Sequence, residues 1–195
     1  MKKTLFSALL ASMLMAVASP LSAQEENGFK KINVREDFTE NGFQWFHDAE
    51  LLAAGDKTKS NAMTIGWGAL GNLWGHGTST VTVYVAEKRF TRQFMEDNEY
   101  FTIMTFKDRD VLRYMGTKSG RDGDKAAALG LHVAYTENGT PYYQEAECVI
   151  ECKTMYSQEF DPKHFRDDVP RDFYNGFSAG FHAFYIGKIV KALKK

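Results

Sequence analysis

Two short stretches of the sequence combine cations with backbone features that bind anions. In the first, Arg89 lies two residues before Thr91, and Thr91 stands where a helix N-cap is expected, ahead of an apolar helix face that begins at Phe94. The first-turn N–H groups of such a helix point outward and its dipole favours negative charge, so it can bind an anion. An ordinary capped helix without a ligand is the alternative.

The second stretch, residues 116–125, places cations among small, flexible residues and leads into a predicted helix near residues 122–124. The candidate binding residues in it are Ser119, Gly120, Arg121 and Lys125. Backbone amides and several cations around one loop form a second candidate anion site. The alternative is a charged loop in contact with solvent only.

The stretch that precedes both anion candidates predicts a surface for a flat ligand. It is predicted to be a strand, and its residues are Asn61, Ala62, Met63, Thr64, Ile65, Gly66 and Trp67. Successive strand residues point to opposite sides, so Ala62, Thr64 and Gly66 would leave one face nearly bare. A bare strand face lets a planar molecule approach the backbone. The glycine-rich segment 68–77 that follows is predicted to be a loop.

Other catalytic patterns fail in their context. Residues 66–71 match the G-x-G-x-x-G dinucleotide fingerprint, but residues 72–77 cannot open the helix that the fingerprint requires. No G-x-S-x-G motif is present, and the five histidines lack metal-ligand spacing. His182 lies among aromatic residues of a predicted strand, where a hydrogen-bonded core histidine is the alternative to a catalytic one.

The N-terminus predicts export. Lys2 and Lys3 precede an apolar run, residues 5–17, and Leu21-Ser22-Ala23 forms a small-residue cleavage pattern. We therefore expect residues 1–23 to be a signal peptide, cleaved near Ala23, and the mature protein to be exported, to the periplasm. A retained membrane anchor is the alternative, but the apolar run is shorter than the roughly 20 residues that a span needs.

Composition indicates one globular domain, with 44% hydrophobic and 14% aromatic residues in a chain of 195. Removing the leader, with Lys2 and Lys3, changes 24 basic against 25 acidic residues to 22 against 25, a net charge of −3. This charge does not suit binding to nucleic acid.

The two cysteines, Cys148 and Cys152, are predicted to be unpaired. They lie four residues apart on a predicted strand, so their Cα atoms would be about 13 Å apart, whereas a disulfide tolerates about 7 Å. We expect them to be buried on one face of the strand, near Ile150.

Alternating apolar residues and turn signals predict a mainly β domain. We expect residues 24–42 to be loosely ordered and one domain to occupy residues 43–195. The predicted strands are 49–56, 61–67, 80–85, 100–106, 131–135, 142–155 and 181–190, with a turn at Asn138-Gly139. Six or seven strands separated by short helices favour an antiparallel barrel over a sandwich or a parallel sheet.

Taken in order, these motifs closely resemble the flavin reductase-like family of FMN-binding split barrels, from about residue 43 to residue 190. The residues that carry the resemblance are Ala53-Ala54-Gly55-Asp56, Asn61 to Gly68, Arg89-Phe90-Thr91, Gly116 to Asp122 with Asp124-Lys125, Glu145-Ala146 and Cys152. The resemblance implies a six-stranded antiparallel split barrel of Greek-key type, with short flanking helices. It also implies a homodimer that binds FMN non-covalently near the dimer interface.

The same resemblance implies roles for the candidate residues. Residues 61–67 would line the isoalloxazine ring of FMN, while Arg89 and Thr91, together with residues 119–121 and Lys125, would hold the phosphate and ribityl chain. The expected function is FMN-dependent oxidoreduction, with NAD(P)H or another electron donor. The alternative is an exported flavin-binding or electron-carrier protein without turnover of its own. Haem is a third possible flat ligand, but no histidine is placed persuasively as its axial ligand.

The chain departs from the family pattern at two places. Ala86-Glu87 stands where related sequences usually have Arg-Pro, so an arginine is lost and a carboxylate gained. Gly180 stands where an acidic residue is common, two positions before His182.

Overall fold

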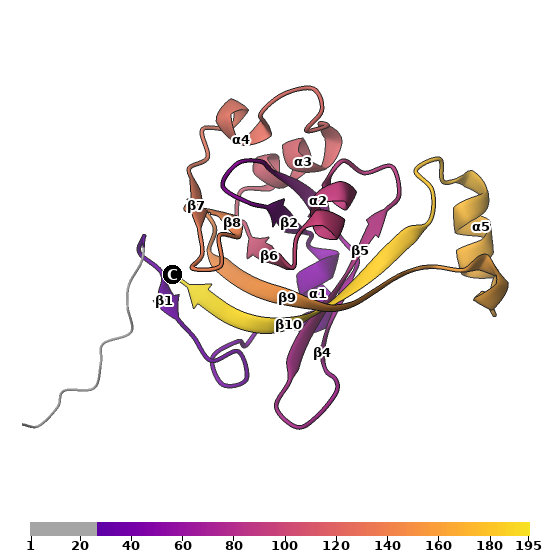
Figure 1. Cartoon of the computed structure of the whole chain (residues 1–195), viewed down its shortest axis with the longest axis horizontal. Helices are drawn as coiled ribbons and strands as arrows, with labels where there is room; N and C mark the ends of the chain where they lie inside the picture. Colours follow the sequence, from indigo (N-terminus) through magenta and orange to yellow (C-terminus); the bar gives the residue numbers. More distant parts are fainter. Residues whose placement is uncertain (1–26) are drawn as a thin grey trace, which may run out of the picture.

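The computed structural model describes residues 27–195, so the predicted signal peptide lies outside the described residues (Figure 1). The main element is an antiparallel sheet with the strand order β3-β2-β6-β9-β10-β5-β4, in which β1 also pairs with β10. Its strands are β1 (Lys30–Lys31), β2 (Glu50–Gly55), β3 (Ser60–Ile65), β4 (Gly68–Asn72), β5 (Ser79–Ala86), β6 (Tyr100–Thr105), β9 (Cys148–Glu159) and β10 (His182–Lys194). A separate pair joins β7 (Val133–Tyr135) to β8 (Pro141–Tyr143).

Short helices connect the strands. They are α1 (Gly42–His47), α2 (Thr91–Asp97), α3 (Arg109–Thr117), α4 (Lys125–Ala128), the 3-10 helix η1 (Pro162–His164) and α5 (Asp168–Gly176). The sequence predicts helices beginning near Thr91, Asp108, residues 122–124 and Asp161, but neither α1 nor α5. The side chains of Asp108 and Asp124 accept hydrogen bonds from first-turn amides of α3 and α4, which explains where these helices begin. In the described residues, none of the helices has the length and apolar character needed to cross a bilayer.

The mainly β, antiparallel prediction is confirmed, but the count of six strands and the closed barrel are not. The sheet has eight strands among the described residues, and its path ends at β3 on one side and β4 on the other. These two end strands are consecutive in the chain and are joined through Gly66 and Trp67, not by a hydrogen-bonded ladder.

The loop predicted for residues 68–77 is wrong in its first half. Residues 68–72 form β4 and pair with β5, from Gly68 opposite Val83 to Asn72 opposite Ser79. A ladder needs only backbone groups, so glycine does not prevent it. Glycine is required at position 68, because a Cβ there would collide with the ring of Phe46.

Both faces of the central strands are buried. Leu51 and Leu52 of β2 point to opposite sides and belong to two separate core clusters. One cluster receives Phe94 from α2, and the other receives Leu112 from α3. The helices therefore cover the two faces from opposite sides and hold the central strands in place.

The predicted state of the cysteines is confirmed. Cys148 and Cys152 are free and buried, and both lie in the same core cluster as Ile150. The turn at Asn138-Gly139 is also observed between β7 and β8, with Gly139 at a φ of 79°. The predicted strand 142–155, however, is interrupted, because β8 ends at Tyr143 and β9 begins at Cys148.

Part of the segment predicted to be loosely ordered is packed on the sheet. The side chain of Phe29 is fully buried, and Lys30 and Lys31 pair with the end of β10. Asn41, in the same segment, caps α1: its side chain accepts hydrogen bonds from the amides of Phe43 and Gln44.

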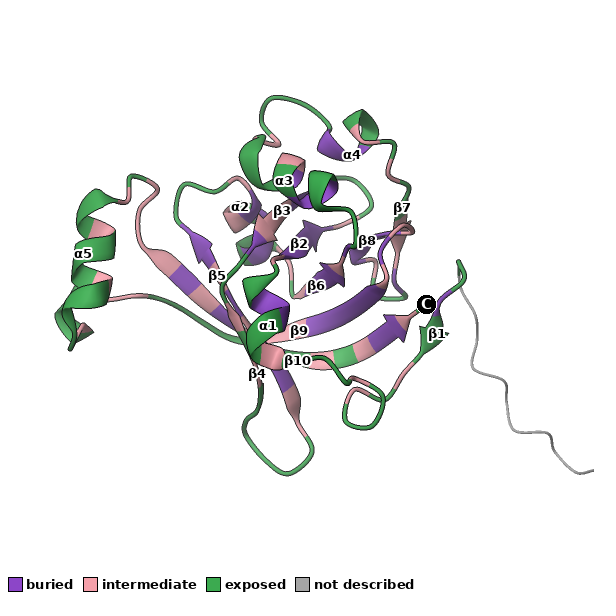
Figure 2. Ribbon diagram, turned by 180° about the vertical axis from the view of Figure 1, so that it is seen from behind, coloured by how far each residue is buried: buried purple, intermediate pink, exposed green. Residues whose placement is uncertain are grey.

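One end of the structure forms an arm, which we define as residues 159–181, where η1 and α5 connect the ends of β9 and β10. Figure 1 shows α5 standing to one side of the sheet. Helix α5 has no buried residue, and in Figure 2 its ribbon is mostly exposed.

A buried carboxyl group in β2 makes stability depend on pH. Glu50 is 2% exposed, and in the described residues its Oε2 atom has no hydrogen-bond partner. Burial raises the pKa of Glu50 from 4.5 to about 8. The folded state therefore holds a proton that the unfolded state releases above about pH 4.5.

We expect the free energy of unfolding to fall as the pH rises from about 5 to 8, with a slope from this group of at most about 1.4 kcal/mol per pH unit. Urea titrations at several pH values would measure it. In Glu50→Gln this part of the pH dependence should disappear. An equal slope in both proteins would contradict the assignment.

Candidate functional site

The two anion candidates lie in one place. A cavity of about 260 Å³ is formed where β3, the β5–α2 connection and the loop after α3 meet, and we call it the cationic cavity. The predicted residues that line it are Asn61, Met63, Arg89, Thr91, Ser119, Gly120, Arg121 and Lys125. Its lining holds five cations, with Lys88 and Lys118 among them, and no carboxylate. In a chain with a net charge of −1, this local excess of positive charge suits an anionic ligand.

The interpretation of a bare strand face is wrong. Ala62 is 2% exposed and packs in the cluster that α3 covers. The hydroxyl of Thr64 donates a hydrogen bond of 2.5 Å to the carbonyl oxygen of Leu112 on α3. A Cβ at Gly116 would lie 3.2 Å from the Cβ of Thr64. Small residues on this face allow a helix, not a ligand, to approach, while Asn61 and Met63 on the opposite face line the cationic cavity.

The end of the same segment lies at a different cavity. Ile65 is buried in the core, whereas Gly66 and Trp67 line a second cavity of about 790 Å³, together with Tyr84 and Phe160. The predicted ring-binding segment therefore runs from the cationic cavity to this second one.

Thr91 has a role other than the predicted one. The N-cap of α2 is Phe90, which makes no side-chain capping bond, and Thr91 is buried within the first turn. Its hydroxyl accepts a hydrogen bond of 2.7 Å from Nδ2 of Asn61. Thr91 therefore orients Asn61 in the wall of the cavity, while the Arg89 side chain is exposed at its edge.

The loop after α3 shapes the floor of the cationic cavity. A Cβ at Gly120 would collide with the side-chain oxygen of Asn61 and would lie 2.8 Å from the ring of Phe90. Arg121 donates its backbone N–H to the Ser119 hydroxyl over 3.2 Å, and its guanidinium lies 4.8 Å from the centre of the Phe90 ring. Phe90 was not predicted as a site residue. Its position between the candidates Arg89 and Thr91 could have indicated that it lies at the same site.

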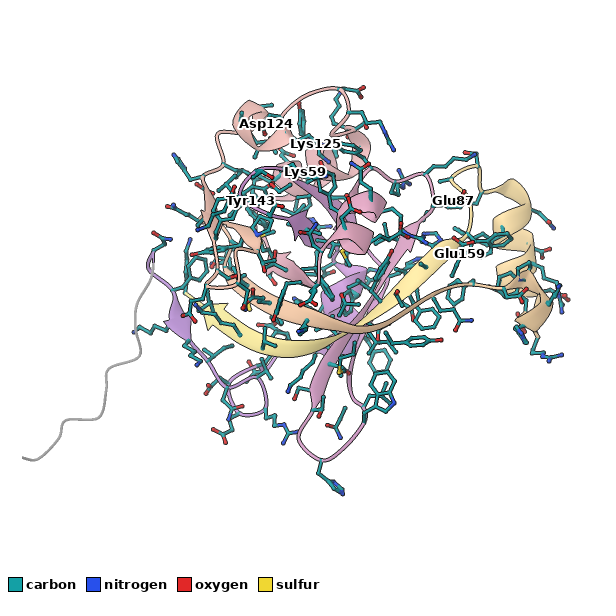
Figure 3. The ribbon with its side chains drawn as sticks, in the orientation of Figure 1. Lys59, Glu87, Asp124, Lys125, Tyr143 and Glu159 are labelled. Carbon is teal, nitrogen blue, oxygen red and sulfur yellow. The ribbon has the colours of Figure 1, made fainter. Side chains whose placement is uncertain are left out.

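Lys125 is a buried cation with all three of its protons in use. Its Nζ donates to the carbonyl oxygens of Ala62 at 2.6 Å, Met115 at 3.1 Å and Lys118 at 3.2 Å. Burial lowers the pKa of Lys125 to about 8, so it is still mostly protonated at neutral pH. In Figure 3 it lies beside Asp124, at the start of α4. Its positive charge contributes to the potential in the cavity, but its three hydrogen bonds stabilise the fold and leave no proton to donate to a ligand.

His182 is held by Tyr174 of α5. Its Nδ1 lies 2.9 Å from the tyrosine hydroxyl, and its ring packs against Trp67, with 4.6 Å between ring centres. Burial, with the positive charges of Arg89 and Arg92, lowers the pKa of His182 to about 4. The imidazole is therefore neutral near pH 7 and cannot act there as a proton donor of imidazolium type. Tyr174 was not predicted, because α5 was not.

The two departures from the family pattern face each other. A Cβ at Gly180 would lie 2.8 Å from the Cβ of Glu87 and would collide with its carboxylate. The N–H of Glu87 also donates to the carbonyl oxygen of Phe181 at 2.9 Å. The carboxylate of Glu87 therefore occupies the space beside position 180. Among the described residues no group of three or more histidine, cysteine or acidic side chains is placed to bind a metal.

Comparisons with solved structures find the same fold in other proteins. The chain resembles a flavoredoxin from Methanosarcina acetivorans with 23% identity and a TM-score of 0.59, over 75% of this chain and 68% of that one. It resembles the FMN-binding domain of a flavin reductases-like enzyme from Shewanella baltica OS155 with 15% identity and a TM-score of 0.61, over 88% and 79%. The flavin reductase HpaC in complex with NADP+ gives 12% identity and a TM-score of 0.51, over 74% and 76%.

These likenesses show the fold. No curated protein matches the chain. The profile of the flavin reductase like domain matches residues 50–194, most of the chain. This protein therefore belongs to the flavin reductase-like domain family.

Proposed function

We propose that this protein is an FMN-dependent oxidoreductase that holds its flavin without a covalent bond. The observation that carries the proposal is the cationic cavity, where residues from three separate segments bring five cations together without a carboxylate. Its volume of about 260 Å³ suits the phosphate and ribityl chain rather than a whole cofactor. The ring would then lie along residues 61–67, toward the second cavity.

The residues that would hold the phosphate are Arg89, Ser119 and Arg121. Arg121 is kept at the cavity by the ring of Phe90, and its Nη1 lies 3.4 Å from the carbonyl oxygen of Lys88. Gly120 lets the loop lie directly against Asn61 and Phe90, where a side chain would collide with them. Arginine pairs well with phosphate, because its planar fork can donate two parallel hydrogen bonds.

When bound, FMN would supply the hydride or electron transfer, and the protein would supply binding and orientation. Trp67 and Met63 would border the ring, and the neutral His182 lies against Trp67. The electron donor that we propose first is NAD(P)H, since a structurally similar flavin reductase was solved with NADP+.

A second candidate function is a flavin-binding electron carrier without turnover of its own. The observation that favours it is His182, the one predicted catalytic residue: it is held against Tyr174 and Trp67, and its low pKa leaves no imidazolium to act as a proton donor near neutral pH. Stopped-flow mixing of the purified protein with FMN and NADH separates the two functions. Rapid loss of NADH absorbance is expected for the enzyme, and tight flavin binding without NADH loss would support the carrier.

We further propose that the mature protein begins after Ala23, that it is exported, and that it works as a homodimer. N-terminal sequencing of the protein from a periplasmic extract would test the first two points. Light scattering on the mature chain would test the third, with a monomeric mass as the contradicting result.

Removing one cation should weaken FMN binding. We expect Arg121→Ala to lose about 1 to 3 kcal/mol of binding free energy, the range for a hydrogen bond to a charged group. Flavin fluorescence titrations would measure it. Arg113→Ala, an exposed arginine of α3 that pairs with Asp110, is the matched control and should bind normally. If riboflavin bound the unmodified protein as tightly as FMN, the phosphate assignment would be wrong.

Lys125 should act on stability even without flavin. Lys125→Met leaves three carbonyl oxygens without their donor, so we expect a loss of roughly 2 kcal/mol or more in the free energy of unfolding. Urea denaturation of flavin-free protein would measure it. Lys118→Met, an exposed lysine of the same cavity, should unfold like the unmodified protein. Equal stability of all three proteins would refute the structural role of Lys125.

A further inference from the structure

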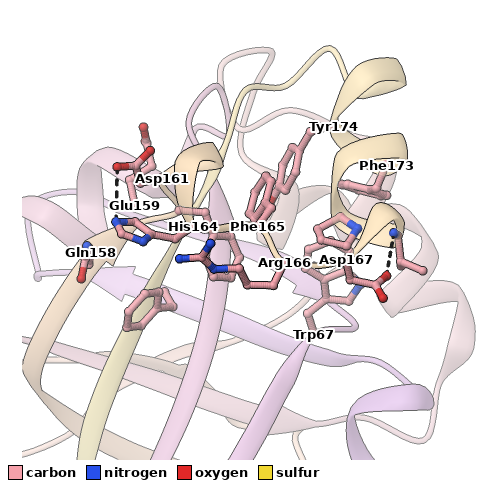
Figure 4. A pocket seen from close by; sticks show the side chains of 14 residues that line it. Trp67, Gln158, Glu159, Asp161, His164, Phe165, Arg166, Asp167, Phe173 and Tyr174 are labelled. Atoms are coloured by element: carbon pink, nitrogen blue, oxygen red, sulfur yellow. Dashed lines mark hydrogen bonds and ion pairs between the residues drawn. The ribbon is translucent and has the colours of Figure 1, made fainter.

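A third cavity lies beneath the arm, and the proposed flavin site does not account for it. It has a volume of about 680 Å³, within the usual range for small-molecule sites. We call it the arm cavity. Its aromatic lining residues are Trp67, Phe160, Phe165, Phe173, Tyr174 and Phe184 (Figure 4).

The aromatic rings are packed against one another around this space. Phe165 and Tyr174 are stacked, with 5.6 Å between ring centres and an angle of 3° between planes. Phe173 lies 5.0 Å from Trp67, and Phe160 lies 5.8 Å from Phe184. Walls made of ring faces and edges suit a planar aromatic molecule, because offset stacking and edge contacts are both available to it.

Most polar groups at the arm cavity already have partners. The carboxylate of Asp167 accepts a hydrogen bond from the Val169 amide at 2.8 Å. It therefore caps the N-terminus of α5 and takes the position that an anionic ligand would need there. Asp161 accepts one from the Lys163 amide at 2.9 Å and lies 3.8 Å from Nε2 of His164. These groups are therefore engaged by the arm itself.

Arg166 is the exception. In the described part of the chain, no hydrogen bond or ion pair involves its guanidinium. In Figure 4 its side chain lies between those of His164 and Asp167, at the cavity. A single unpaired guanidinium beside aromatic walls can bind one carboxylate or sulfonate through two parallel hydrogen bonds.

A dinucleotide does not suit these features. It carries two phosphates, whereas the arm cavity offers one unpaired cation, and Asp167 fills the one helix start that could bind a phosphate. We propose that the arm cavity binds a planar aromatic molecule with one anionic group. This site stands on the arm cavity alone and does not require a bound flavin. Its wall at Trp67 borders the proposed ring site, which would bring such a ligand beside it.

The probe is 2-naphthoate, titrated by calorimetry into the whole mature protein without flavin. We expect one molecule bound per chain, and Arg166→Gln should weaken binding roughly tenfold or more, as expected for a lost charge-assisted hydrogen bond. Lys163→Gln, a nearby exposed cation outside the lining, should bind within about twofold of the unmodified protein. The neutral analogue 2-naphthalenemethanol should bind more weakly and should not respond to Arg166→Gln.

Phe173→Ala supplies a second readout, because it removes wall area and should weaken both naphthalene compounds several-fold. Far-UV circular dichroism would check that the arm of the Phe173→Ala protein is intact. If it is not, the test depends on Arg166→Gln alone, because Arg166 is exposed and its replacement should not disturb the fold. The proposal fails if 2-naphthoate does not bind, if Arg166→Gln binds it normally, or if decanoate binds as tightly and responds equally.

Discussion

The buried ammonium group of Lys125 is the interaction on which the rest of the site depends. It joins the backbone of β3, the last turn of α3 and the loop that follows. Taking a charge out of water is costly, and only a complete set of hydrogen bonds offsets that cost. Because all three protons find carbonyl oxygens, the loop containing Ser119 to Arg121 is held against β3. The cations at its surface therefore remain gathered around one cavity despite their mutual repulsion.

The covering of both sheet faces explains where a ligand has access. On one side the small residues of β3 allow α3 to pack against the strand, and on the other side Ile65 is buried in the core cluster that also contains Phe94. Two places remain open to a ligand: the cationic cavity beside Asn61 and Met63, and the edge of the sheet where β3 ends and Gly66 and Trp67 lead into β4. The two ends of the strand path meet there without a ladder, so backbone and side chains at this seam face cavities instead of neighbouring strands.

The sequence was sufficient to predict the antiparallel strands, the family and eight of the residues that meet in the cationic cavity, but not Phe90. The pattern of apolar residues predicted β2, β5 and β6. The cations of residues 116–125 could be read directly from the sequence and predicted an anion site. The use of each residue could not be predicted. Thr91 looks like a cap in sequence, but its hydroxyl is taken by Asn61 from a strand thirty residues earlier. Ala62 and Thr64 looked open because α3, which covers them, is distant in the chain. Helix α5 was missed although its apolar and polar residues lie on different faces, because it is short and none of its residues enters the core.

The unpaired cysteines of β9 have a consequence for reactivity. Burial raises the pKa of Cys148 to about 12 and that of Cys152 well above its ordinary value. Only the thiolate is nucleophilic, so neither sulfur reacts readily while the sheet is closed. A small alkylating reagent could therefore modify them only after β9 separates from its neighbours. The rate at which such a reagent modifies the two thiols would therefore report how often β9 separates from the sheet. The same packing that suppresses their reactivity protects them from oxidation.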